Sequence, residues 1–397
     1  MKSNFLTYLF GNIIFGFTQW FIIILILKLG TKTELGTYTY SIAIIAPLIL
    51  FLSFGFNTLV VTTDNFKKSN YIKARWMVSF IVICIYMSII VFFTGISREN
   101  YLLIFFIGLS KMAENLYDID YAFFIKDKMH KYVGYYKLIL SFTQIGLIIV
   151  CFYIYQNLVI SFAIYSMTLL LFNLIKNRHQ LFVKEAFLIS SFKLYKVGIP
   201  ISITLFLSSL NTNIPKYFIE FHNNIVAVGI FSSFLTIYSA GNTFFFSLYN
   251  YVLPKAVKYK YDKKYLKSLF IKIIGIGILS FSFVQIINMT ILENIIPLIF
   301  NEDFLTYKFE ISIVLLSSVL VYVSILMDLF INGHNKYKYN TYVQVFNVFV
   351  VFLGSFILIN KLEVLGAVLT FSIFSISVFL LKTLLSVKII KGASYEV

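Results

Sequence analysis

The sequence predicts an all-α polytopic membrane protein with about twelve transmembrane helices, arranged as two six-helix lobes around a central cavity. Hydrophobic residues make up 59% of the chain, whereas charged residues make up only 13%. Apolar runs of roughly twenty residues, the length at which a helix crosses a bilayer core, alternate with short polar connections. The connections are too short for an aqueous domain, so any chemistry must take place within or at the edge of a membrane.

Twelve apolar runs are predicted to cross the membrane: 5–27, 36–60, 74–94, 101–125, 132–155, 158–175, 197–214, 225–250, 268–290, 309–331, 341–359 and 363–385. A basic, polar connector at 176–196 leaves six spans on each side. We therefore predict an N-terminal lobe at 1–190 and a C-terminal lobe at 191–397. Equal halves are typical of transporters whose two lobes rock about a central cavity.

The distribution of basic residues predicts the topology. The chain has 33 Lys and Arg residues and a net charge of +16, and most of them fall in alternate loops and both tails. These segments are Lys2, 67–75, 126–137, 176–196, 255–272, 336–338 and 382–391. The positive-inside rule then places both termini in the cytoplasm. Because insertion alone accounts for this charge, it is no argument for nucleic-acid binding.

Neither the cysteines nor the N-terminus indicates secretion. Cys84 and Cys151 fall within predicted spans, so they do not form a secreted disulfide framework. The first apolar run is long enough to remain as a helix, so we expect no cleaved signal peptide.

Charged residues interrupt the fourth span. Lys111, Glu114 and Asp118 are spaced by three and four residues, which places them on one stripe of a helix. An ionised side chain near the bilayer centre costs roughly 2.5–3.5 kcal/mol, so the stripe should face protein or water. One interpretation is a cavity lined by this stripe and the flanking Tyr117 and Tyr121. The other is an ion pair between Lys111 and Glu114, with Asp118 bound to a basic group of a neighbouring helix.

Three further positions are weaker candidates. Asp120 faces the opposite side of the same helix, nearer the cytoplasm. Asp328, near the cytoplasmic end of span 10, either takes part in ion coupling or reaches the interface. Arg75, at the start of span 3, either contacts a lipid phosphate or anchors the helix at the interface. The remaining single polar residues of the first lobe are explained by hydrogen bonds between helices; they are Asn12, Gln19, Asn57, Gln144 and Asn173.

A polar patch at 211–220 closes the outward end of span 7. It contains Asn211, Asn213 and the only basic residue of its predicted loop, Lys216. A cation beside amides can receive a phosphate or a sugar. The alternative is a solvated loop charge paired with Glu220.

Two of these segments carry a resemblance to a known family. The run from Lys111 to Tyr121, followed by Lys126, Met129, Tyr136 and Lys137, resembles the fourth-to-fifth-helix segment of the O-antigen and capsule repeat-unit flippases, the Wzx-type polysaccharide transporters. The segment 211–220 resembles the region after helix 7 in that family, and 35–38 with Pro47 resembles its second helix. Lys216 stands where the family often has Arg. Lysine lacks the bidentate hydrogen bonding by which arginine binds phosphate. Ile125 and Lys126 stand where the family often has a glutamine.

The resemblance implies a member of the multidrug, oligosaccharidyl-lipid and polysaccharide exporter superfamily, with two six-helix lobes that open alternately to each side. The implied activity is to flip an undecaprenyl-pyrophosphate-linked oligosaccharide from the cytoplasmic to the outer leaflet of the bacterial inner membrane, driven by a proton or sodium gradient. No cofactor or metal is implied. Implied partners are the lipid-linked glycan, membrane lipid, and a polymerase and chain-length regulator of the same pathway.

On this hypothesis the pyrophosphate and glycan bind in a cationic, aromatic cavity, with Lys111 attracting the pyrophosphate. The predicted substrate-binding residues are Lys111, Tyr117, Tyr121, Asn211, Asn213, Lys216 and Arg75. The predicted ion-coupling residues are Glu114, Asp118 and Asp328.

Other functions are less well supported by the sequence. A glycan polymerase or acyltransferase needs reactive groups at an aqueous edge, but the outer loops are short. The four histidines lie in separate loops without metal-ligand spacing; they are His130, His179, His222 and His334. A drug or small-molecule exporter of the same superfamily is the main alternative. A flippase for lipid-linked peptidoglycan precursors would normally have two more spans.

Overall fold

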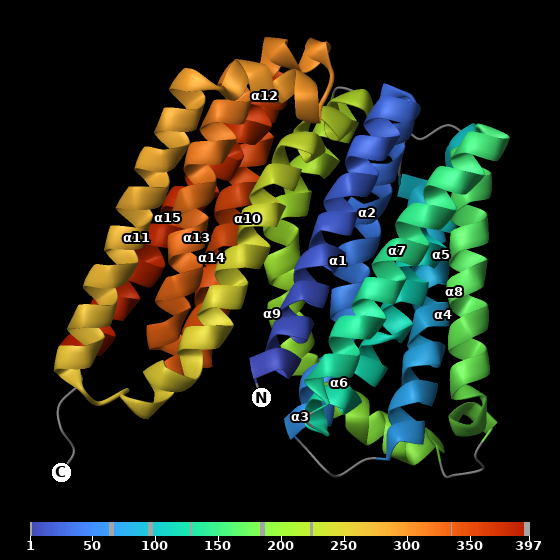
Figure 1. Cartoon of the computed structure of the whole chain (residues 1–397), viewed down its shortest axis with the longest axis horizontal. Helices are drawn as coiled ribbons and strands as arrows, with labels where there is room; N and C mark the ends of the chain where they lie inside the picture. Colours follow the sequence, from blue (N-terminus) through green and yellow to red (C-terminus); the bar gives the residue numbers. More distant parts are fainter. Residues whose placement is uncertain are drawn as a thin grey trace. The chain divides into compact units, whose positions relative to one another are not determined.

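The computed structural model describes residues 2–62, 67–93, 98–127, 129–182, 187–222, 225–334 and 336–392. These residues are almost entirely helical and contain no β-strand, which confirms the predicted all-α class (Figure 1). The chain divides into two compact units. The first unit comprises Met1–Leu25 and Gly30–Asn213, and the second comprises Ile26–Leu29 and Ile214–Val397.

The helices account for every predicted span. Nine helical stretches in the described ranges are long and apolar enough to cross a membrane, so the prediction of a multi-pass membrane protein is confirmed. One of the nine, Lys338–Gly392, contains the last two predicted spans. The two spans outside these nine stretches, the charged fourth span and the seventh span, are also helical.

The helices that contribute to the first unit are α1 (Lys2–Leu29), α2 (Lys32–Leu52), α3 (Phe56–Thr62), α4 (Lys68–Phe93), α5 (Tyr101–Leu116), α6 (Asp118–Lys126), α7 (His130–Tyr155), α8 (Leu158–Phe182) and α9 (Phe187–His222). The helix α2 begins with a capping box, in which Thr31 and Glu34 satisfy each other's backbone N–H groups. A turn at Tyr117 separates α5 from α6. The charged stripe is therefore shared between two consecutive helices.

The second predicted span is broken between α2 and α3. Phe54 and Gly55 both have positive φ, at 50° and 58°. This conformation is unfavourable for a bulky residue such as phenylalanine. Gly198 of α9 packs directly against the break, because a Cβ there would collide with the carbonyl oxygen of Phe54. After the break, α3 begins at Phe56, and Asn57 is its second residue.

Glycines let α1 and α7 approach each other closely. A Cβ at Gly134 would collide with the carbonyl oxygen of Thr7, and one at Gly11 would collide with the carbonyl oxygen of Gly134. Both contacts are with backbone, which cannot move aside as a flexible side chain can. The same two helices carry four polar residues of the site described below, namely Asn12 and Gln19 of α1 and Lys137 and Gln144 of α7.

The second unit contains α10 (Ile225–Lys258), α11 (Lys263–Thr290), α12 (Leu292–Ile299), α13 (Lys308–Gly333), α14 (Tyr337–Gly354) and α15 (Asn360–Gly392). Its core packs α10, α11, α13 and α15 around side chains such as Met327 and Phe330. A short π-helical segment, η3 (Ser355–Ile359), follows α14. Within α15, Glu363 has φ 50° and ψ −123°, and this sharp kink separates the eleventh and twelfth predicted spans.

A charged cavity in the first unit

A cavity of about 290 Å³ lies within the first unit. Its polar lining comes from α5, α6 and α7 and consists of Lys111, Glu114, Asn115, Asp118, Tyr121 and Lys137. Its apolar lining comes mainly from α2, with Phe15 of α1 and Leu140 of α7. The structure thus places the three charged residues of the predicted stripe at one cavity. Its volume is near the lower end of the range for ligand sites, roughly 300–1,000 Å³.

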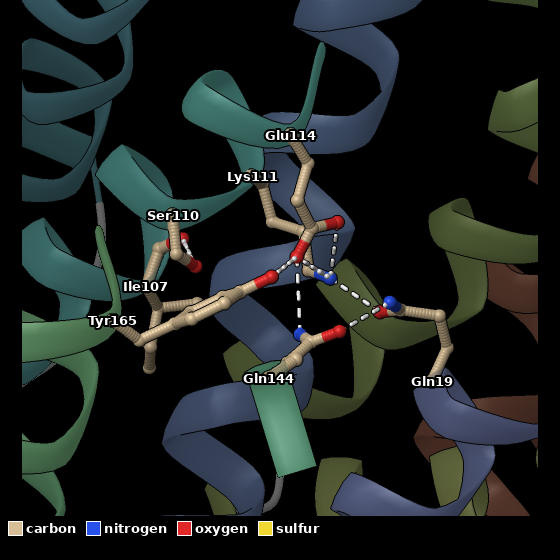
Figure 2. Close-up of polar contacts among 7 residues, drawn as sticks. All are labelled: Gln19, Ile107, Ser110, Lys111, Glu114, Gln144 and Tyr165. Carbon is tan, nitrogen blue, oxygen red and sulfur yellow. Dashed lines mark hydrogen bonds and ion pairs between the residues drawn. The ribbon is translucent and has the colours of Figure 1, made fainter. Parts of the chain in front are cut away.

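A closed ring of hydrogen bonds surrounds Glu114 (Figure 2). The Nζ atom of Lys111 lies 3.0 Å from Oε2 of Glu114 and also donates to Oε1 of the Gln19 side chain. The amide of Gln19 donates to Oε1 of Gln144 at 3.0 Å, and the amide of Gln144 donates to Oε1 of Glu114 at 3.0 Å. The hydroxyl of Tyr165 donates to the same oxygen at 3.1 Å.

Four helices contribute to this ring, namely α1, α5, α7 and α8. Little solvent reaches its charges, because the side chains of Lys111 and Glu114 are only 13% and 11% exposed. Burying an ion pair is costly unless further hydrogen bonds satisfy its remaining donors and acceptors. The two glutamines and the tyrosine supply those bonds, so both alternatives for Lys111 and Glu114 hold together: they form an ion pair, and they line the cavity.

Asp118 lies beside this ring among polar and basic groups. Its Oδ2 accepts a hydrogen bond from Nδ2 of Asn115 at 3.1 Å. Asn57, which directly follows the break between α2 and α3, also hydrogen-bonds to it. Arg75 of α4 and Lys137 of α7 both attract the carboxylate electrostatically. The broken second span thus supplies a direct partner to the site.

Arg75 is not an interface anchor, and that interpretation was wrong. Its side chain is 2% exposed, and Nη1 donates to Oδ1 of Asn115 at 2.8 Å. The guanidinium also stacks over the ring of Phe56 at 5.2 Å. A position at the end of an apolar run looks interfacial in the sequence, but packing of α3 and α5 against α4 buries it.

Lys137 was assigned to a basic cytoplasmic segment, whereas the structure places it in α7 at the cavity. Its Nζ donates to Oδ1 of Asn12 at 2.6 Å. The ammonium lies 5.5 Å from the ring centre of Phe15 and 5.6 Å from that of Tyr121. Asn12, like Gln19 and Gln144, was expected only to form a hydrogen bond between helices, and it does so with a charged partner.

Tyr117 and Asp120 face away from the cavity lining. The hydroxyl of Tyr117 donates to the backbone carbonyl of Leu169 in α8 at 2.9 Å, within an apolar cluster. Asp120 is 1% exposed and lies 3.0 Å from both Lys68 and Lys176. It therefore ties the start of α4 to α6 and α8.

The polar patch at 211–220 is helical, so its interpretation as a loop was wrong. The helix α9 continues to His222 and contains Asn211, Asn213 and Lys216. The amide of Asn213 donates to the carbonyl oxygen of Ser209 at 2.9 Å, a bond within its own helix. None of these three residues is among those that line the cavity of the first unit.

Asp328 belongs to a separate ion pair in the second unit. Its Oδ2 lies 2.7 Å from Nζ of Lys382, and Asn340 also hydrogen-bonds to its carboxylate. Lys382 was assigned to the basic C-terminal tail, but it is 5% exposed and lies within α15. Asp328 reaches a buried partner rather than the interface.

Sequence reasoning missed the roles of Gln19, Gln144, Tyr165 and Lys137. The first two were visible as single polar residues in apolar spans, but no spacing links residues of α1 to residues of α7. Across the described residues, no group of three His, Cys, Asp or Glu side chains could hold a metal ion.

The fold is shared with solved structures of a flippase and of a transporter. The inward closed conformation of the lipid II flippase MurJ superposes with a TM-score of 0.74 and 16% identity, covering 99% of this chain and 90% of that one. The Vibrio cholerae MATE transporter VcmN superposes with a TM-score of 0.65 and 12% identity, covering 98% of this chain and 96% of that one. At these identities the likeness establishes the fold, and it confirms the predicted all-α polytopic architecture.

The chain also has a relative by sequence. The chain is 28% identical over 392 residues to the capsular polysaccharide biosynthesis protein CapF of Staphylococcus aureus. The match covers 94% of this chain and 96% of CapF. No protein-family model matches the chain.

Proposed function

We propose that the protein is a flippase that moves undecaprenyl-pyrophosphate-linked oligosaccharide repeat units from the cytoplasmic to the outer leaflet of a bacterial inner membrane. The observation that carries the proposal is the charged cavity of the first unit, because polar space of this kind inside an apolar helix bundle needs a polar cargo. Similarity to CapF along nearly the whole chain supports a role in capsule assembly. The fold shared with MurJ and VcmN supports transport as the activity.

The physical problem that such a protein solves is the head group of the substrate. Pyrophosphate charges and sugar hydroxyls would lose their water in hydrocarbon at a cost of several kcal/mol for each unpaired group. A cavity with cations, amides and an aromatic hydroxyl replaces part of that hydration. The polyprenyl tail stays in lipid, where its transfer costs nothing.

The proposed transport cycle is alternating access of two lobes, 1–190 and 191–397, about a cavity, with both termini in the cytoplasm. Glu114 and Asp118 are the proposed coupling groups in the first unit, and Asp328 in the second. A carboxylate that gains a proton or exchanges a cation partner changes the hydrogen bonds that hold several helices together. The gradient that drives the cycle is a proton or sodium gradient.

Deletion of the gene tests the proposal directly. We expect surface glycan to disappear and lipid-linked repeat units to accumulate in the cytoplasmic leaflet, as measured by mass spectrometry of extracted lipids and by their protection from added glycosidase. Outer-leaflet units that accumulate without polymer would instead indicate a polymerase. Normal surface glycan with increased drug sensitivity would indicate a small-molecule exporter.

Complementation with Lys111→Ala tests whether the charged ring is needed. We expect no surface glycan, because Glu114 loses its ionic partner. The double variant with Glu114→Gln removes both charges and separates a loss of function from a loss of stability. Full complementation would exclude Lys111 from the mechanism.

A further inference from the structure

The charges around the cavity do not balance. Lys111, Arg75 and Lys137 contribute three cations, whereas Glu114 and Asp118 contribute two carboxylates. Lys111 and Glu114 neutralise each other, and Asp118 is shared between Arg75 and Lys137. With all five groups ionised, the cluster carries one surplus positive charge.

Among the cations of this cluster, Lys137 lines the cavity without an ion pair of its own in the described residues. Its direct contacts are neutral groups, namely the amide oxygen of Asn12 and the rings of Phe15 and Tyr121. Within the described ranges no carboxylate lies at ion-pair distance from it. A lysine ammonium has three N–H donors, and this hydrogen bond uses one of them. Lys137 therefore borders the cavity with donors to spare.

Lys111 and Arg75 are less suited to contact a ligand. Lys111 is held by both oxygens of Glu114 and by Gln19. Arg75 does not line the cavity and is buried behind Asn115, to which it donates. Tyr121, by contrast, lines the cavity with its ring centre 5.6 Å from the Lys137 ammonium, and its buried hydroxyl has no hydrogen-bond partner in the part of the chain that the structure describes.

We propose that Lys137, with Tyr121 beside it, is the primary contact of this cavity for an anionic phosphate group. The inference rests on the proposed function, in which this phosphate is part of the pyrophosphate of the lipid-linked substrate. An anion here supplies the negative charge that the side chains lack, and it receives charge-assisted hydrogen bonds. Lys111 then keeps the ring around Glu114 together instead of gripping the pyrophosphate.

Binding of farnesyl pyrophosphate to the purified full-length protein in phosphatidylcholine nanodiscs tests the proposal. Fluorescence can report binding, because the chain contains only two tryptophans, Trp20 of α1 and Trp76 of α4, on helices that carry Gln19 and Arg75. Lys137→Gln should weaken the affinity by roughly tenfold or more, as expected for loss of a hydrogen bond to a charged group. Lys137→Arg should retain affinity within about threefold. The matched control is Lys131→Gln, a charge removed from the same helix outside the cavity lining.

Asn12→Asp is a second test that leaves Lys137 in place. This nearly isosteric change keeps the oxygen that accepts from Lys137 and turns it into a carboxylate, so the surplus cation gains an ionic partner. We expect a loss of affinity similar to that of Lys137→Gln. A lysine with a purely structural role would be held more firmly by the introduced carboxylate and would leave affinity unchanged.

Two sources of phosphate are distinguished by the lipid. If a phospholipid head group is the natural occupant, added phosphatidylglycerol should compete with farnesyl pyrophosphate in the wild type but not in Lys137→Gln. Lack of competition supports the pyrophosphate of the substrate.

Affinity that is normal in both Lys137→Gln and Asn12→Asp overturns this assignment and leaves the proposed function standing. A wild-type protein that binds no farnesyl pyrophosphate at all contradicts both.

Discussion

The two units bury charge in different ways. In the first unit, three cations and two carboxylates gather at a cavity of about 290 Å³. In the second, Asp328 and Lys382 form a one-to-one pair. A cavity of about 220 Å³ in the second unit has an apolar lining of Ile274, Gly277, Ile278, Phe281, Val319, Leu320, Val323 and Phe379. A buried ion pair alone is therefore not a candidate binding site. The first unit has such a site because a cavity and an unbalanced charge lie beside its ion pair.

The largest effect is expected from breaking the ring of the first unit. Lys111→Met should lower the free energy of unfolding by about 3–5 kcal/mol, because it leaves Glu114 buried without its cation. Adding Glu114→Gln should restore most of that loss, since both charges are then gone. Unfolding in detergent titrated with SDS measures both variants. A double variant as unstable as the single one would show that the glutamines, rather than the ion pair, hold the ring.

Breaking the Asp328–Lys382 pair of the second unit tests whether the pair only stabilises the fold or takes part in ion coupling. Asp328→Asn should cost about 1.5–3 kcal/mol, the range for a hydrogen bond to a charged group. The exchanged variant, Asp328→Lys with Lys382→Asp, should recover stability. Surface glycan in cells that carry the exchanged variant then decides the role. Stable protein without surface glycan would assign Asp328 to ion coupling, and normal glycan would make the pair structural.

The close contact of α1 with α7 predicts a third effect. Gly134→Ala should cost about 1–3 kcal/mol, because its Cβ would meet the backbone of Thr7 and push the two helices apart. Gly146→Ala on the same helix is the control, since nothing lies within 4 Å of that position. Thermal unfolding in detergent compares them. Equal midpoints for the two variants would contradict a tight crossing of α1 and α7.

The smallest effect is expected at the kink of the second unit. Glu363→Gly should stabilise the protein by up to about 1 kcal/mol, because relief of backbone strain at φ 50° exceeds the entropic cost of glycine. Surface glycan should be unchanged, since Glu363 is neither a proposed coupling residue nor among the residues that line the cavity of the first unit. The control is Glu363→Ala, which keeps the strain. A stabilising alanine would attribute the gain to loss of the carboxylate.

Most of the fold was predictable from the sequence, because the ability of a segment to cross a bilayer as a helix depends on its own amino-acid composition. Within the described residues, the twelve apolar runs are helical apart from short breaks at 53–55 and at Tyr117, since about twenty apolar residues suffice whatever their neighbours are. The stripe of Lys111, Glu114 and Asp118 was predictable for the same reason: helical spacing is local. Tyr117 was misplaced because its neighbour α8, which offers the carbonyl of Leu169, is remote in sequence.

The sequence by itself determined an all-helical, multi-pass protein with ionisable groups concentrated on its fourth span. Only the tertiary structure decided which of those groups are paired. Arg75, Lys137 and Lys382 look like loop charges when read along the chain. Neighbouring helices bury Arg75 and Lys382 and partly bury Lys137. Gln19 and Gln144 lie 125 residues apart and form one hydrogen bond. The length of an apolar run is a local property of the sequence, whereas the charge balance in a cavity depends on helices that meet only after folding.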